Sequence, residues 1–212
     1  MSPLMNRAGL DALRQVIASR RSVRRYASMP ITRELIDELL SCAVNAPSAH
    51  NRQPWRFIVL RDLASKTTLA DAMGRRLRSH LLQDGIQPSH ADLDVDRSSE
   101  RIRCAPVAIL VFCTTEDMDV YPDSERQGAE YTLAVQSTSM AVQNLLLAAH
   151  SAGLAGCWMC APMFCPDVVR ATLTFPTHWH PQALVTLGIP LTNGKPYTRR
   201  PLSDVVRYVE DM

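Results

Sequence analysis

Residues 131–151 constrain the fold of this chain more than any other segment, because as a helix they would be apolar on almost every face. Val135, Met140 and Leu145 would lie on different sides of such a helix. An amphipathic helix covers one side of a core, whereas a helix that is apolar all round needs neighbours on several sides. We therefore expect residues 131–151 to form a helix at the centre of the fold or in a subunit interface.

The other patterns predict a single α+β domain that spans residues 1–212. Residues 107–113 are continuously apolar, as in a strand that is covered on both faces. Shorter strands are expected at residues 57–60, 156–160 and 183–189. Amphipathic helices are expected at residues 10–19, 32–44, 63–82 and 166–173, with a weak point at Gly74. The polar stretch 83–103 has the weakest pattern, and we expect it to be the most mobile segment.

Charge and hydropathy argue against several classes of function. The 23 basic and 21 acidic residues nearly balance, so no overall field would hold a nucleic acid. Residues 145–165 have the length of a membrane span, but His150, Gly153 and Pro162 interrupt them, so we expect no membrane segment. The N-terminal residues lack an apolar signal core, and the six cysteines are expected to be reduced, buried thiols of a cytoplasmic protein.

The first candidate site is a basic run that follows the first expected helix. Residues 20–25 combine a hydroxyl with four guanidinium groups, the groups that neutralise and hydrogen-bond a phosphate: Ser22 with Arg20, Arg21, Arg24 and Arg25. A solvated basic loop is the alternative. Arg199 and Arg200 form a second basic pair near the C-terminal end of the sequence.

The second candidate site is the polar loop at residues 45–55. It places amide, hydroxyl and imidazole groups between two prolines, which suits hydrogen bonding to a polar heteroaromatic ring. An ordinary connection between a helix and a strand is the alternative. The place of His50 in this loop would allow it to donate a proton to a reduced acceptor, although a histidine that faces solvent is the preferred interpretation.

The third candidate site is residues 153–158. Gly153 and Gly156 would let the backbone approach a flat ligand, and a helix cap followed by a turn is the alternative. Metal binding has weak support. The spacing Cys157-x2-Cys160 lacks a second ligand pair, and His178-x-His180 lacks a third ligand nearby. We therefore expect no metal, and we expect Cys157, Cys160 and Cys165 to be buried thiols.

These motifs, taken in order, resemble those of the nitroreductase-like FMN oxidoreductases. The resemblance rests on four segments: residues 20–24, Pro47-Ser48 with residues 51–55, residues 143–150, and residues 153–158. It extends from about Leu13 to Val206. Residues 121–122, Glu130 and residues 158–169 are also similar to the flavin-binding domain of the ligase that glutamylates a deazaflavin coenzyme.

The resemblance implies a three-layer α+β sandwich with a central, mostly antiparallel sheet, assembled as an intertwined homodimer that binds FMN at the subunit interface. By position, the phosphate and ribityl chain would contact Arg20, Arg21, Ser22 and Arg24, with Arg199 or Arg200 closing on the phosphate. The other subunit would supply Pro47, Ser48, Asn51 and Gln53. The backbone of Leu154, Ala155 and Gly156 would lie along the flavin ring. Residues 83–103 would vary and help to shape the substrate pocket.

The same resemblance implies that FMN carries the chemistry, taking a hydride from NAD(P)H and passing it to a nitroaromatic, quinone or enone-like small molecule in a ping-pong cycle. We therefore assign no side chain as an acid or base. Two other functions stay open: a reduction step in deazaflavin coenzyme maturation, and flavin binding without catalysis. Ala49 and Ala155 depart from the family pattern, so one hydrogen bond to the ring is expected to be missing.

Overall fold

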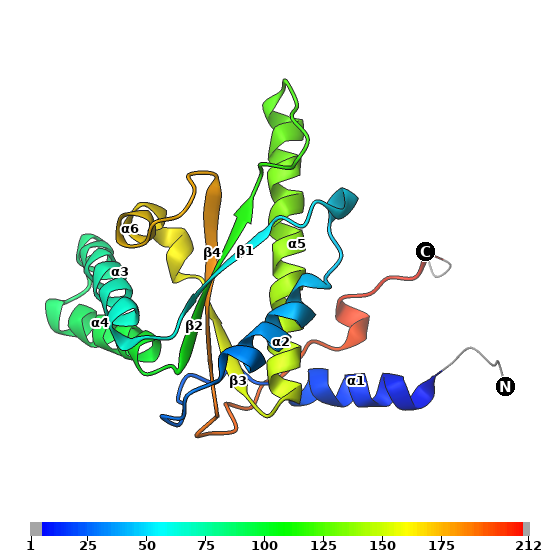
Figure 1. Ribbon diagram of the computed structural model, residues 1–212, viewed down its shortest axis with the longest axis horizontal. Helices are drawn as coiled ribbons and strands as arrows, with labels where there is room; N and C mark the ends of the chain where they lie inside the picture. The colour runs from blue at the N-terminus through cyan, green and yellow to red at the C-terminus, as the bar shows by residue number, and fades with distance from the viewer. Residues whose placement is uncertain (1–5, 210–212) are drawn as a thin grey trace.

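A computed structural model describes residues 6–209 and confirms an α+β architecture with helices on both faces of one sheet (Figure 1). The four strands are β1 (Trp55–Leu60), β2 (Val107–Thr114), β3 (Ala155–Met159) and β4 (Trp179–Gly188). They are ordered β1-β2-β4-β3, and every neighbouring pair is antiparallel. The longer α-helices are α1 (Arg7–Ser19), α2 (Arg33–Val44), α3 (Leu63–Gln83), α4 (Pro88–Arg103) and α5 (Ser124–Ser151). The short helices are α6 (Pro166–Thr172) and the 3-10 turns η1 (Ala49–Asn51), η2 (Ala161–Phe164) and η3 (Leu202–Asp204).

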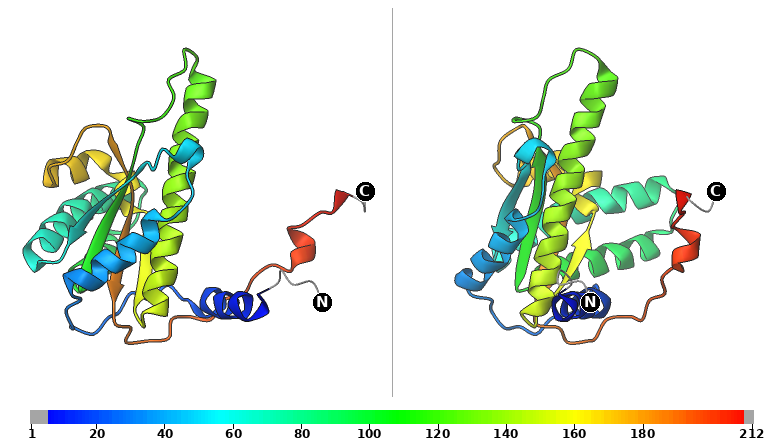
Figure 2. Two further views of the ribbon diagram at one scale, coloured as in Figure 1. Left: turned by 45° about the vertical axis from the view of Figure 1, so that its right-hand side comes forward. Right: turned by 90° about the vertical axis from the view of Figure 1, so that its right-hand side faces the viewer.

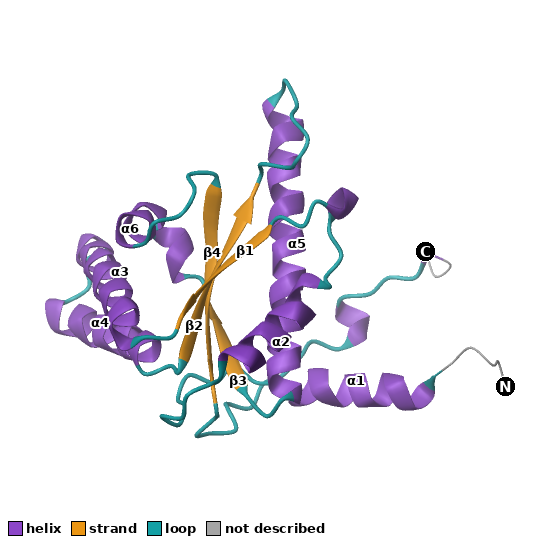
Figure 3. Ribbon diagram, viewed as in Figure 1, coloured by secondary structure: helices purple, strands orange, loops and turns teal. Residues whose placement is uncertain are grey.

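The sheet separates two apolar cores, which explains why β2 is apolar along its whole length. Ile109 and Val111 face α2 and α5, where they pack with Leu145. Leu110 and Phe112 face α3, α4 and α6 on the other side. Figure 3 shows the strands between these two groups of helices. All eight residues of β2 are buried, as the continuous apolar pattern predicts.

The long helix α5 occupies the position that its apolar sequence predicts. Ala141, Val142 and Leu145 are buried against the sheet and α2. Its outer side stays open, since Gln136, Met140 and Gln143 lie on one face and are exposed. One chain therefore covers only part of α5.

The polar stretch 83–103 differs most from the simple expectation, because most of it forms the helix α4. Pro88 occupies the first turn, where the ring costs no hydrogen bond. Ala91, Ser99 and Ile102 are buried and pack the helix against α3. A Cβ on Gly74 of α3 would lie 3.0 Å from the Ser99 hydroxyl, so this glycine allows the close approach of the two helices and does not interrupt α3. The mobility of residues 83–103 stays a prediction.

Two segments project from this body on the same side of the molecule, as Figures 1 and 2 show. α1 contains no buried residue, although Leu10, Leu13 and Ile17 form an apolar stripe along it. The chain from Leu191 to Val209 contains no strand, and its one regular element is the 3-10 turn η3; it exposes Leu202, Val205 and Tyr208.

Candidate functional site

The basic run beyond α1 is held as an extended segment along β3, which is an edge strand of the sheet. Ser22 forms a parallel bridge to Gly156, and the Val23 N–H donates to the Gly156 carbonyl (3.2 Å). Val23 and Tyr26 are buried. The Tyr26 hydroxyl donates to the Val23 carbonyl and lies 2.8 Å from the Thr186 hydroxyl, and burial raises the pKa of this tyrosine. These anchors fix the backbone from which the arginines extend.

The basic run lines two different cavities, with Ser22, Arg24 and Arg25 in the larger one and Arg21 in the smaller one. The larger one, here called the α4 cavity, has a volume of about 680 Å³ and lies between the basic run, α4 and the loop after β4. Its polar lining comprises Ser22, Arg24, Arg25, Arg97, Glu100, Arg101, Thr192 and Lys195. Figure 2 shows α4 on one side of β3 and α5 on the other.

The α4 cavity is strongly positive. Arg24 and Arg25 come from the basic run, Arg97 and Arg101 lie one turn apart on α4, and Lys195 follows β4. The pKa of the buried Cys157 thiol is raised by desolvation, but Arg24, Arg101 and Arg20 each act to lower it. Guanidinium groups from the basic run and from α4 therefore act on the same thiol in the middle of β3.

The smaller cavity, with a volume of about 270 Å³, lies on the α5 side and includes Arg21, His150, Leu154 and Ala155. The Arg21 guanidinium donates to the Ala18 carbonyl (2.6 Å) and stacks on the Tyr197 ring at 4.1 Å. Its contacts in this structure thus join the end of α1 to the C-terminal segment. The predicted contact of Arg21 with phosphate stays a prediction.

The two glycines of the third motif have clear structural roles. Gly153 has a φ of 77° and follows α5, and the Leu154 N–H closes the turn on the Ala149 carbonyl (2.9 Å). This is the cap and turn that we kept as the alternative. A Cβ on Gly156 would lie 2.8 Å from Leu187 Cδ2 and 2.9 Å from Leu146 Cδ2. Gly156 therefore allows β3 to pack against α5, and the contact of this backbone with a flavin ring stays a prediction.

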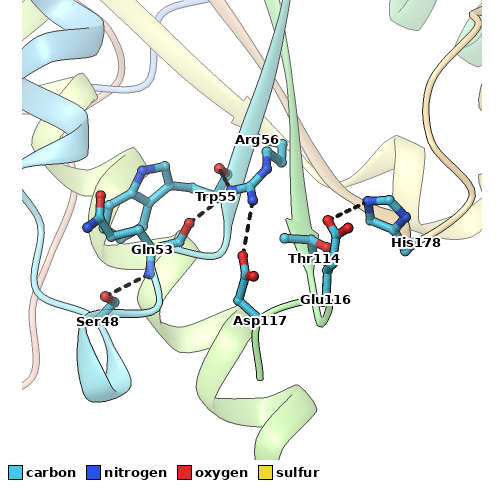
Figure 4. A network of polar contacts seen from close by, with 8 residues as sticks. All are labelled: Ser48, Gln53, Trp55, Arg56, Thr114, Glu116, Asp117 and His178. Carbon is cyan, nitrogen blue, oxygen red and sulfur yellow. Dashed lines mark hydrogen bonds and ion pairs between the residues drawn. The ribbon is translucent and has the colours of Figure 1, made fainter. Parts of the chain in front are cut away.

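The polar loop after α2 has a strained backbone, which supports its interpretation as a functional site. His50, Asn51 and Gln53 have φ values of 48°, 55° and 49°, although none of them is glycine. Such conformations cost about 1–2 kcal/mol each and persist only where neighbouring contacts impose them. The Gln53 N–H donates to Ser48 Oγ (3.0 Å), and Arg56 Nη1 donates to the Gln53 carbonyl (2.9 Å), as shown in Figure 4.

Ion pairs connect the polar loop and β1 to the loop that leads into α5. Arg52 Nη2 lies 2.6 Å from Asp119 Oδ1, and Arg56 Nη2 lies 3.6 Å from Asp117 Oδ2. Figure 4 shows the second pair beside the contact between His178 and Glu116 (2.9 Å). His50 is exposed, as preferred from the sequence.

A single chain does not bring all the predicted site residues together. The polar loop packs on the middle of α5, where the Ala49 N–H donates to Ser137 Oγ (3.4 Å), and none of Pro47, Ser48, Asn51 and Gln53 lines the α4 cavity. Arg199 stacks on Tyr197 at 3.8 Å, and Arg199 and Arg200 are exposed. Within the described residues, Ser22 and Arg24 are the predicted residues that line the α4 cavity.

The cysteine prediction is wrong for part of the set. Cys113, Cys157 and Cys165 are buried, but Cys42, Cys104 and Cys160 are exposed. Cys160 lies just beyond the end of β3, where its sulfur accepts a hydrogen bond from Trp158 Nε1 (3.0 Å). In the part of the chain that the structure describes, no three histidine, cysteine or acidic side chains are grouped to hold a metal, and no helix is both long and apolar enough to cross a bilayer.

The sequence analysis missed the arginines of α4. Arg97 and Arg101 lie four residues apart and therefore on one face of the helix, and Glu100 lies beside them. Two sequence signals were available: Pro88 at the helix start, and a stripe of small or apolar residues at Ala91, Val95, Ser99 and Ile102.

Comparison with known proteins matches residues 17–189 to the model of the Nitroreductase family. A Thermus thermophilus protein named NADH dehydrogenase is 32% identical, with 93% of this chain and 95% of the relative covered. A Rhodospirillum rubrum protein named 5,6-dimethylbenzimidazole synthase is 34% identical, with 87% and 83% covered.

Solved structures agree with this assignment. A Desulfovibrio desulfuricans nitroreductase, described as a complex with FMN, has a TM-score of 0.69 and 28% identity, with 92% of this chain and 94% of that chain covered. A BluB-like flavoprotein from Clostridium difficile shares the fold, with a TM-score of 0.73 and 23% identity over 93% of this chain and 98% of that chain. The fold and the family resemblance predicted from the sequence are thereby confirmed.

Proposed function

The chain belongs to the nitroreductase family, and we propose that it is an FMN-dependent oxidoreductase that uses NAD(P)H to reduce a nitroaromatic, quinone or enone-like acceptor in a ping-pong cycle. The observation that carries this proposal is the α4 cavity. Its volume of about 680 Å³ lies within the range of small-molecule sites. Its hydroxyl and guanidinium groups are the partners that a phosphate ester requires. The residues present therefore fit FMN.

Each residue of the basic run has a role in this proposal. Ser22 and Arg24 line the cavity, so they would hold the phosphate and ribityl chain together with Arg20. Arg21 would contribute its charge from the other side of the segment. The FMN, when bound, supplies the hydride transfer, and the protein binds and orients it. No side chain is assigned as an acid or base.

We also propose that the functional unit is a homodimer. The polar loop lies away from the α4 cavity in one chain, so a second chain is needed to bring Pro47, Ser48, Asn51 and Gln53 to the flavin. The unburied apolar stripe of α1 and the exposed apolar residues of the C-terminal segment offer surfaces for that contact. In a dimer Arg199 or Arg200 would also reach the phosphate. The six free cysteines are compatible with the reducing environment of the cytoplasm.

An anaerobic absorption spectrum tests the proposed function. Protein reconstituted with FMN should show a bound flavin spectrum that bleaches when NADPH or NADH is added. Binding without bleaching by either reductant would indicate a flavin carrier, and absence of binding would refute the proposal. Arg24→Gln should weaken FMN binding by about tenfold or more, because a charge-assisted hydrogen bond is lost. Arg75→Gln, which removes an exposed arginine of α3 outside the α4 cavity, is the matched control.

A second candidate is the formation of 5,6-dimethylbenzimidazole, and the 34% identical relative with that name favours it. The test is product analysis by liquid chromatography after the reduced, FMN-loaded protein is exposed to oxygen. Accumulation of the benzimidazole would favour this second candidate. Flavin that is reoxidised intact would favour the reductase.

A further inference from the structure

The α4 cavity carries more positive charge than an FMN phosphate would neutralise. Arg24, Arg25, Arg101 and Lys195 have no ion-pair partner among the described residues. Glu100 is the one carboxylate among the residues that line the cavity. A phosphate monoester carries a charge of about −1.5 to −2 near neutral pH. Positive charge therefore remains after the proposed cofactor is bound.

Part of the remaining charge lies on α4. Arg101 lies on α4 and is half-buried, and Arg97 is one turn earlier on the same face. Arg97 is also paired with Asp94 (3.1 Å), so Arg101 is the α4 arginine that is free to bind a ligand in this structure. Helix α4 is packed firmly on α3, since Ala91, Ser99 and Ile102 are buried between the two helices. Arg101 is thus presented by a fixed element.

We propose that Arg101, supported by Arg97, binds an anionic group of the second ligand in this cavity, so that the protein selects an anionic substrate. This inference rests on the proposed function and deepens it. The anionic group is a carboxylate or sulfonate of the electron acceptor, or the 2′-phosphate of NADPH. Both ligands use the same cavity in turn in a ping-pong cycle, and a guanidinium recognises all three groups through paired N–H donors.

The chemistry of the reaction is unchanged by this selection. A hydride leaves NAD(P)H, the acceptor gains two electrons and the protons that solvent supplies, and Arg101 forms no covalent bond. Arg101 acts only by stabilising the bound anion, so its removal should affect anionic ligands and spare their neutral analogues.

The experiment compares matched ligand pairs on the FMN-loaded protein. The acceptor pair is 4-nitrobenzoate and 4-nitrobenzamide, and the reductant pair is NADPH and NADH. The measured quantities are the ratio of kcat/KM within each pair and, independently of turnover, the calorimetric Kd of each acceptor for the oxidised protein. We expect the wild-type protein to favour the anionic member of at least one pair. Arg101→Gln should reduce that preference by about tenfold, the size of one charge-assisted hydrogen bond.

Two variants make the result specific to charge and geometry. Arg101→Lys keeps the charge but not the paired donors, so it should restore part of the preference. Arg75→Gln should leave the ratios unchanged, because Arg75 is exposed and outside the cavity. If Arg101→Gln changes the kcat/KM ratio of the acceptor pair alone, the bound anion belongs to the acceptor. If it changes the ratio of the reductant pair alone, the bound anion is the 2′-phosphate of NADPH.

Equal ratios in the wild-type protein and Arg101→Gln, with FMN still bound and reduced, would overturn the inference and leave the proposed function intact. Failure to bind or reduce FMN in the wild-type protein would refute the proposed function itself. If turnover with nitro compounds is too slow, the calorimetric Kd values decide between these outcomes. The inference would also be overturned if the anionic ligand bound the wild-type protein and Arg101→Gln with the same Kd.

Discussion

Gly156→Ala tests whether this glycine serves packing, as the structure shows, or close approach to a ligand, as its motif suggests. The added Cβ would lie 2.8 Å from Leu187 Cδ2, 2.9 Å from Leu146 Cδ2 and 3.1 Å from the Thr186 carbonyl oxygen. The two leucine side chains can shift, but the Thr186 carbonyl belongs to the central strand β4 and cannot move freely.

The expected magnitude follows from two opposing effects. Overpacking of a core costs about 1–3 kcal/mol. Replacing glycine by alanine also lowers the conformational entropy of the unfolded chain, which stabilises the folded protein by about 0.5–1 kcal/mol. We expect a net loss of about 1–2 kcal/mol in the free energy of unfolding, which for a chain of this size lowers Tm by roughly 2–8 °C.

The assay is chemical and thermal unfolding at fixed protein and FMN concentrations, because bound ligand and dimerisation both raise the apparent stability. Gly128→Ala is the matched control. Gly128 is exposed on α5, no atom lies within 4 Å of its added Cβ, and the change should stabilise the helix by about 0.5–1 kcal/mol. If Gly156→Ala were as stable as the wild type but bound FMN more weakly, the packing argument would be refuted.

Three further predictions concern assembly, pH and local stability. Leu13→Glu places a charge in the apolar stripe of α1, so light scattering after gel filtration should show a shift from dimer to monomer. An unchanged dimer would exclude α1 from the interface. His180 has a pKa lowered by burial and by Arg170, so the unfolded state binds its proton more tightly. Stability should therefore fall as the pH drops below about 6.5, and in urea titrations His180→Gln should show a smaller fall. Thr32→Ala removes the hydroxyl that caps α2 through the Leu35 N–H (3.3 Å) and should cost about 1 kcal/mol in the same titrations.

Elements with strong periodicity could be predicted from the sequence because their local pattern and their environment agree. β2 is apolar throughout and buried on both faces, and α5 extends through the core as its composition requires. A threonine before an apolar stripe is a local signal for a helix cap, and Thr32 has this role in α2, where its hydroxyl accepts the Leu35 N–H. Such signals need no knowledge of the rest of the fold.

Helix α4 shows why part of the site could not be predicted. Its sequence is polar because most of its surface faces solvent or the α4 cavity, and only a narrow stripe touches α3. The stripe uses alanine and serine, which contribute little to an apolar pattern but allow the close approach at Gly74. The contribution of Arg101 to the cavity depends on that approach, which is a long-range contact that local sequence does not encode.

The strained polar loop is the place where local preference and fold disagree most. Left-handed backbone is most often signalled by glycine, yet His50, Asn51 and Gln53 adopt it, and only the asparagine is a residue that does so routinely. Hydrogen bonds at Ser48 and Arg56 hold Gln53 in place, and the ion pair between Arg52 and Asp119 connects the loop to the segment before α5. Such a conformation costs about 1–2 kcal/mol per residue, and strained residues of this kind cluster at active sites and ligand clamps. The strain therefore supports a binding role for the loop, independently of the motif that first suggested it.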